Sequence, residues 1–174
     1  MNLEKVSKQT RKLLVVRDSL QQALALLDYI EKIELCPASD LYTPMLAGIV
    51  TTYMKNFVSS DGFGPLPHTY SKFPNGKRMK QIHQKMIDSR NSIYAHRADN
   101  ENIKITVTLK GTALEFVPTD VVLNPNILKE YKDLIEFQLD RINNDFNGKV
   151  ACLLENSNES FEIGRTYILG DTFP

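Results

Sequence analysis

The segment RKLLVVRDSLQQALALLDYIEK, residues 11–32, decides the class of fold. Its apolar residues recur every three or four positions, which places them on one stripe of a helix. We expect this helix to run from about Glu4 to Glu34 and to end before Pro37, because proline disfavours helical geometry in the residue before it. The residues of the stripe are Leu13, Val16, Leu20, Leu24, Leu27 and Ile30.

Two more helices are expected in the next part of the chain. The second begins at Ser39 or Asp40, both common N-cap residues, and tolerates Pro44 in its first turn. Its inner face consists of Tyr42, Leu46, Ile49, Tyr53 and Phe57. The third runs from about Gly76 to Ala95. The residues in line along it are Met79, Ile82, Met86, Arg90 and Ile93.

The fourth helix has the clearest ends in the sequence. Asn124 is expected as its N-cap, Pro125 as its first residue and Gly148 as its C-terminal stop. Its buried side consists of Leu128, Tyr131, Ile135, Leu139 and Ile142. Residues 59–76, between the second and third helices, are rich in glycine, proline and serine, and loops of this length are usually functional or mobile.

A small β element is expected between the third and fourth helices. Ile103, Ile105 and Val107 alternate with polar residues, and a Lys-Gly pair at 110–111 then turns the chain. This pattern predicts a β-hairpin over about residues 102–118.

The predicted fold is therefore mostly α. We expect a four-helix bundle over residues 1–149 that carries the hairpin, followed by a C-terminal extension over residues 150–174 that packs on the bundle. Within this extension, the segment VACLLE is compatible with either helix or strand.

Composition limits the class of protein. Lysine plus arginine (21) balance aspartate plus glutamate (21), so no global charge draws the chain toward nucleic acid or membrane. No apolar run approaches the roughly 18 residues of a membrane span, and the charged N-terminus lacks the apolar core of a secretory signal. Cys36 and Cys152 are too few for a disulfide framework and lack the spacing of a zinc site. We therefore expect a soluble, cytoplasmic protein with no membrane partner.

The charge is distributed unevenly. From Lys72 to Arg97 there are seven basic residues and one acidic residue, a net charge of +6. A basic helix preceded by a basic loop is the kind of patch that engages phosphates, although a solvated helix face is the more ordinary interpretation. Tyr70 and Phe73 lie beside the patch, where they could stack on bases or anchor the loop to the bundle.

The sequence RNSIYAH, residues 90–96, contains the one chemical motif. Arg90 lies on the apolar stripe of the third helix, where a guanidinium is costly to bury without partners. His96 follows at the end of that helix, where the helix dipole favours a protonated imidazole. In the simpler interpretation, Arg90 reaches out of the bundle and His96 caps the last turn. Arg78 and His83 form a second such pair, which we treat as incidental, although its charge could still contact RNA.

The motif resembles the arginine–polar–x4–histidine signature of the HEPN superfamily. Members of that superfamily are small helical bundles found in toxin–antitoxin, abortive-infection and other RNA-targeting systems. Asn91 after the arginine and the small Ala95 before the histidine both fit the pattern. The resemblance covers roughly residues 10–147, and the phrase at residues 88–99 also looks like an abortive-infection branch. Ala98 stands where HEPN toxins paired with nucleotidyltransferase antitoxins carry a tyrosine, so control by modification there is not expected.

The resemblance implies a metal-independent endoribonuclease that acts as a homodimer and leaves 2′,3′-cyclic phosphate ends. Cleavage of RNA without a metal needs a base, an acid and positive charge on the phosphorane. One chain offers a single His96 and a single Arg90, whereas a two-fold dimer brings two of each into one cleft. His96 is then the general acid or base, Arg90 stabilises the developing charge, and Asn91 orients the imidazole or the phosphate. The RNA-binding candidates are Lys77, Arg78, Lys80, Lys85, Tyr94 and Arg97.

Two other functions stay open at this point. A HEPN-like bundle could bind RNA or a protein without cutting, with Arg90 and His96 gripping phosphate or holding a dimer interface. The chain could also be a helical interaction domain unrelated to RNA, with an antitoxin or regulatory protein as its partner. The sequence has neither a GxxxxGK[ST] phosphate loop nor an HExxH motif, so we expect no cofactor and no metal.

Overall fold

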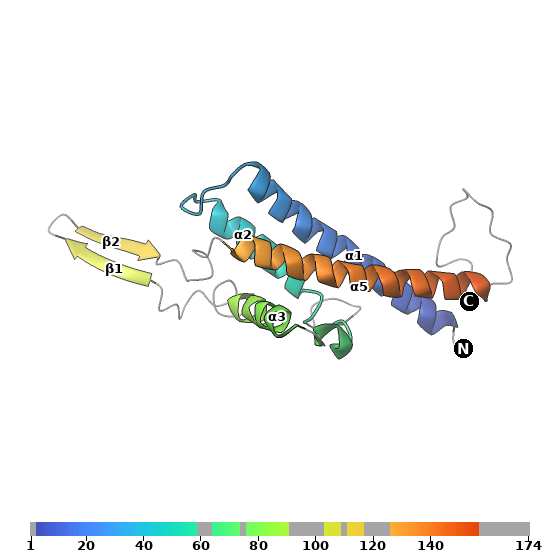
Figure 1. Ribbon diagram of the computed structural model, residues 1–174. Helices are drawn as coiled ribbons and strands as arrows, with labels where there is room; N and C mark the ends of the chain where they lie inside the picture. Colours follow the sequence, from blue (N-terminus) through green and yellow to red (C-terminus); the bar gives the residue numbers. More distant parts are fainter. Residues whose placement is uncertain are drawn as a thin grey trace.

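The computed structural model of the chain describes residues 3–58, 64–73, 76–90, 103–108, 111–116 and 126–156. Over these residues the protein is mostly helical, as the sequence predicts (Figure 1). The described α-helices are α1 (Leu3–Lys32), α2 (Tyr42–Met54), α3 (Lys77–Ser89) and α5 (Ile127–Glu155), and a short 3₁₀ helix, η1 (His68–Ser71), precedes α3.

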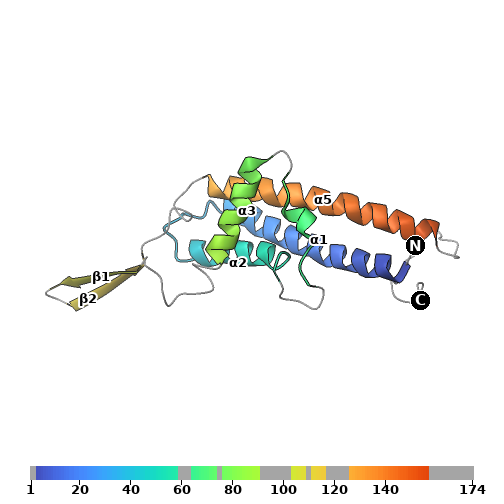
Figure 2. The same cartoon turned by 90° about the horizontal axis from the view of Figure 1, so that it is seen from below.

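The four described α-helices pack against one another. The most extensive contacts between them join α1 to α2 and α5, and α3 to α2 and α5. α1 and α5 lie side by side along most of their length, and α3 crosses over α2 and α5 (Figure 2). The centre of the core is filled by large side chains that are almost completely buried: Leu20, Leu27, Ile30, Leu46, Ile49, Tyr53, Met86, Tyr131, Leu134 and Ile135.

The apolar stripe of α1 is confirmed by its burial. Every residue of the predicted stripe is buried except Leu24, which is half-buried. The helix ends in a Schellman motif, in which the amide of Glu34 donates to the carbonyl of Glu31 (3.1 Å) and the amide of Leu35 to that of Ile30 (3.1 Å). Glu34 has a φ of 48°, in the left-handed region that usually selects glycine. The chain is thus turned three residues before Pro37, so proline is not what ends the helix.

α2 keeps its predicted inner face but begins later than the sequence suggests. Leu41 occupies the N-cap position without a side-chain hydrogen bond, so neither Ser39 nor Asp40 caps the helix. The hydroxyl of Ser39 instead accepts a hydrogen bond from the amide of Leu41 (3.3 Å), which holds the turn before the helix. Pro44 lies in the first turn, as expected. Phe57 is half-buried beyond the end of the helix.

α5 differs from its prediction at both ends. It begins at Ile127 with Asn126 at the N-cap position, two residues after the expected start. It passes through Gly148 and ends at Glu155, so the expected stop is wrong. A glycine inside a helix costs about 1 kcal/mol relative to alanine. Leu153 lies beyond that point and is only 2% exposed, and burying a leucine side chain contributes about 1.5–3 kcal/mol, which outweighs this cost. The predicted domain boundary after residue 149 therefore falls inside a continuous helix.

The two described strands form an antiparallel sheet, β1 (Ile103–Thr108) and β2 (Gly111–Phe116). Its register pairs Ile103 with Phe116 and Thr108 with Gly111. Both strands lie in the segment where alternation predicts a hairpin, and they stand apart from the helices (Figures 1 and 2).

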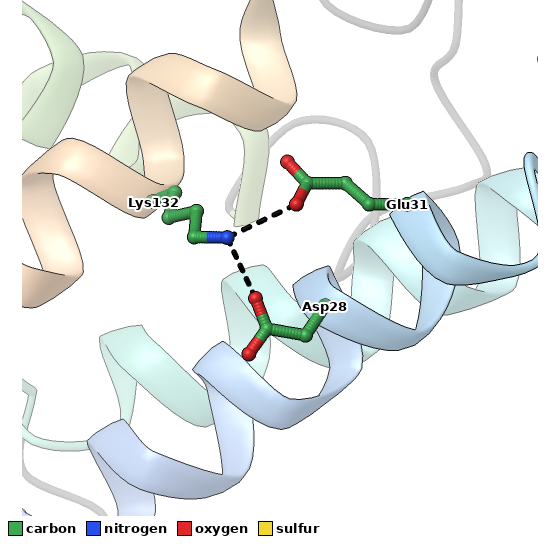
Figure 3. Close-up of polar contacts among 3 residues, drawn as sticks. All are labelled: Asp28, Glu31 and Lys132. Atoms are coloured by element: carbon green, nitrogen blue, oxygen red, sulfur yellow. Dashed lines mark hydrogen bonds and ion pairs between the residues drawn. The ribbon is translucent and has the colours of Figure 1, made fainter.

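One lysine ties α5 to α1 near the end of α1. The ammonium of Lys132 donates to Asp28 (2.7 Å) and to Glu31 (3.0 Å), which lie on the same side of α1 (Figure 3). These hydrogen bonds and the two carboxylate charges raise the pKa of Lys132. All three side chains are partly exposed, so solvent screens the attraction, and such surface pairs contribute little to stability.

None of the helices in the described part of the chain is long and apolar enough to cross a membrane.

Candidate functional site

Arg90 is the one residue of the RNSIYAH motif that the structure describes. It follows α3 directly at the C-cap position, with helical dihedral angles and its amide bonded to the carbonyls of Met86 and Ile87. Its side chain is half-buried. The other predicted motif and binding residues beyond it lie outside the described residues: Asn91, Tyr94, His96 and Arg97.

The two sides of α3 have different character. An α-helix turns by about 100° per residue, so Arg90 lies within about 20–40° around the helix axis of Met79, His83 and Met86. These three residues are buried or half-buried. Lys77 and Lys85 are exposed and lie about 140° away from Arg90 around the helix. The structure therefore gathers the exposed lysines on the solvent side of α3 and places Arg90 on the side that faces the core.

The predicted RNA-binding residues of α3 fall into two groups. Lys77, Lys80 and Lys85 are exposed, and we call them the lysine face. Arg78 is also exposed, but its guanidinium forms an ion pair with Glu130 of α5 (3.3 Å). The side chain of Glu130 is only 16% exposed, so this carboxylate partly neutralises Arg78. Arg78 therefore links α3 to α5, and among the described residues no ion pair neutralises the lysine face.

His83 belongs to the core and not to a catalytic pair. Its side chain is buried among aromatic rings, with Phe57 and Phe73 at centroid distances of 4.7 and 5.4 Å. Its Nδ1 lies 3.0 Å from the hydroxyl of Tyr53. Burial lowers the pKa of His83 to about 4, so the ring is neutral near pH 7. Arg78 points about 140° away around the helix. His83 therefore contributes no charge to RNA, which confirms that the Arg78–His83 spacing is incidental.

The aromatic residues before α3 anchor their segment to the bundle. Tyr70 is buried and its hydroxyl donates to Asp145 of α5. Phe73 packs against His83 and Phe137, so the interpretation as an anchor is the correct one for both residues.

Arg141 of α5 fixes the same segment by its backbone. Its guanidinium donates to the carbonyls of Thr69 (2.9 Å), Tyr70 (3.0 Å) and Lys72 (3.3 Å). The guanidinium also lies 5.1 Å from the ring centre of Tyr70. The sequence gives no signal for this contact, because the segment and the arginine are about 70 residues apart.

A second site appears where the sequence indicates none. A cleft of about 320 Å³ lies between the first half of α1, the last part of α5 and the segment around η1. Lys12 and Lys149 line it from opposite helices, together with Asp145. Lys149 lies seven residues, or about two helical turns, after buried Ile142, so the periodicity of α5 places it on the packed side of the helix. The sequence prediction missed it because the predicted helix stops at Gly148.

Within the part of the chain that the structure describes, no cluster of three or more histidine, cysteine, aspartate or glutamate side chains is arranged to hold a metal ion. No protein family, curated protein or solved structure matches the chain.

Proposed function

We propose that the protein is a metal-independent endoribonuclease of the HEPN type that acts as a homodimer. The observation that carries this proposal is Arg90, which ends α3 of a helical bundle on the core-facing side of the helix. A guanidinium can bind a phosphate group through two parallel hydrogen bonds, which is the recognition that the proposed reaction needs. The motif that Arg90 opens contains His96 six residues later, and the resemblance assigns the proton transfers to that histidine.

Three residues of each copy carry out the proposed cleavage of RNA. His96 of one copy takes the proton of the 2′-hydroxyl, and His96 of the second copy gives a proton to the leaving 5′-oxygen. The two Arg90 side chains stabilise the charge that develops on the phosphorane. Asn91 orients the imidazole or the phosphate. The resulting ends are a 2′,3′-cyclic phosphate and a free 5′-hydroxyl, and the role of such an enzyme is in toxin–antitoxin, abortive-infection or related defence.

One observation favours the alternative, a bundle that binds RNA without cutting it. The lysine face is turned away from Arg90 by about 80–140° around α3, so phosphates held there do not lie against the arginine of the same chain. Binding through three lysines and cleavage at the motif are therefore separable properties, and each needs its own experiment.

The test of cleavage is an assay on pooled tRNA and mRNA in excess EDTA. We expect the wild-type protein to leave 2′,3′-cyclic phosphate ends, and we expect both Arg90→Ala and His96→Ala to abolish them while the proteins stay folded. Two matched controls replace exposed residues of the same types elsewhere, Arg11→Ala and His68→Ala, and they should cut at the wild-type rate. Equal activity in His96→Ala and the wild type would exclude the proposed role of the motif.

The test of binding is the salt dependence of RNA affinity. Replacing Lys77, Lys80 and Lys85 together by glutamine removes up to three phosphate contacts, and each contact contributes roughly 0.7–0.9 to the slope of log affinity against log salt. We expect the slope to fall by about 2. The control replaces three exposed lysines of other helices, Lys8→Gln, Lys32→Gln and Lys129→Gln, and should leave the slope unchanged. Binding without cleavage would identify the protein as a binding module.

A further inference from the structure

The cleft of about 320 Å³ has the size and the composition of a site for a small amphiphilic molecule. Its apolar wall comprises Leu13 of α1 together with Leu66 and Pro67 of the segment before η1. Neither Arg90 nor any residue of α3 is among the described residues that line it, so the cleft is distinct from the lysine face.

The cationic groups of the cleft are held in place by the fold. The ammonium of Lys12 donates to the carbonyl of Pro65, and that of Lys149 donates to the side-chain oxygen of Gln9 (3.0 Å). An ammonium has three donors, so each of these lysines keeps donors beyond the one used among the described residues. Burial lowers the pKa of Lys12, which shows that its ammonium is drawn partly out of water and would gain from a bound anion.

The charges of the cleft define the ligand further. Lys12 and Lys149 carry two positive charges, and Asp145 carries one negative charge that is held by the hydroxyl of Tyr70. The net charge of the wall is therefore +1. A ligand with one negative charge neutralises this charge, whereas a ligand with two negative charges would leave one of them uncompensated. A polar head at the lysines and an apolar tail on Leu13, Leu66 and Pro67 would match both parts of the wall.

From this arrangement we propose that the cleft between α1, α5 and η1 binds a small organic carboxylate with an apolar tail, recognised by Lys12 and Lys149. The ligand would bridge two helices and the anchored segment, because the cleft is lined by all three. The proposal is independent of whether the protein cuts RNA.

The experiment is a titration of the ¹⁵N-labelled full chain with hexanoate, followed by the amide shifts of Leu13, Thr69 and Lys149. We expect saturable shifts with a Kd of about 1 mM or tighter. Hexanamide has the same tail without the charge, and hexylammonium reverses the charge, so both should bind at least about tenfold more weakly. Inorganic phosphate has no tail and should also bind more weakly. These comparisons need no variant, so they hold even if a substitution disturbs the fold.

A pair of matched variants tests the lysines themselves. Lys12→Gln with Lys149→Gln should weaken hexanoate at least about tenfold. Lys8→Gln with Lys129→Gln makes the same charge change on the same two helices outside the cleft and should bind like the wild type. The proposal is overturned if hexanoate gives no saturable shift, if hexanamide binds equally well, or if both double variants bind alike.

Discussion

The buried histidine of α3 makes the stability of this protein depend on mild acid. The pKa of His83 falls from its ordinary 6.5 to about 4 because the ring is desolvated in the folded chain. As the pH falls below about 6.5, the unfolded chain takes up a proton at this residue that the folded chain does not. The free energy of unfolding therefore decreases with acid, and the decrease levels off below about pH 4.

The size of the effect follows from the two pKa values. At pH 7 the imidazole is mostly neutral in both states, so its contribution is small. At pH 5 it is mostly protonated only in the unfolded chain, and the linkage relation gives a loss of about 2 kcal/mol relative to pH 7.

The perturbation that isolates this loss is His83→Phe. A phenyl ring suits the aromatic surroundings formed by Phe57 and Phe73 and cannot take up a proton. The substitution removes the contact with the hydroxyl of Tyr53, but that hydroxyl also bonds to Gln138. Any loss of stability from the missing contact is the same at every pH, so it does not affect the comparison between pH 7 and pH 5.

The assay is urea unfolding followed by circular dichroism at pH 7, 6 and 5. Between pH 7 and 5, the wild type should lose about 2 kcal/mol more than His83→Phe. A control, His68→Gln, replaces an exposed histidine and should follow the wild type. If the wild type and His83→Phe lose stability in parallel, the reasoning about a neutral, buried His83 is refuted.

Four other substitutions test the forces within the fold. Glu34→Gly relieves a left-handed residue at the end of α1 and should raise the free energy of unfolding by about 1 kcal/mol, measured by urea unfolding; a decrease would contradict the Schellman assignment. Lys132→Met should change the free energy of unfolding by less than about 1 kcal/mol, whereas Leu20→Ala in the core should lower it by about 2–5 kcal/mol. A larger loss for Lys132→Met than for Leu20→Ala in the same assay would contradict this prediction. Arg141→Met removes three hydrogen bonds to the backbone of residues 69–72, so trypsin should cut at Lys72 faster than in the wild type; an unchanged rate would show that the arginine does not hold the segment.

The helical frame could be predicted from the sequence because its signal is periodic. The stripe of α1 and the inner face of α2 both depend on spacings of three and four, and packing against the core then buries the same residues. Ends were harder to predict. Gly148 is a common stop signal, but the helix continues past it, where Leu153 is buried and Lys149 donates a hydrogen bond to Gln9 of α1. Glu34 is not a glycine, so nothing in the sequence indicates the left-handed turn that ends α1.

The site could be predicted only in part, since its contacts join distant residues. Local periodicity predicts that Arg90 lies on the apolar side of the third helix, and the structure places it on that side, at the C-cap position of α3. The pairing of Arg78 with Glu130 and of His83 with Tyr53 depends on how the helices cross, which spacing does not reveal. The cleft escaped prediction for the same reason, because Lys12 and Lys149 meet only when the first and last described helices pack together.

The pairing of α1 with α5 has a consequence for the synthesis of the chain. Lys132 and Glu31, which join these helices, are 101 residues apart in the sequence. At the usual 5–20 residues per second, a ribosome needs roughly 5–20 s to add that length. During this interval the apolar stripe of α1 lacks its main partner, with only α2 available to cover part of it. Nascent chains that stall before Ile127 should therefore aggregate or recruit chaperones, whereas chains that complete α5 should fold at once.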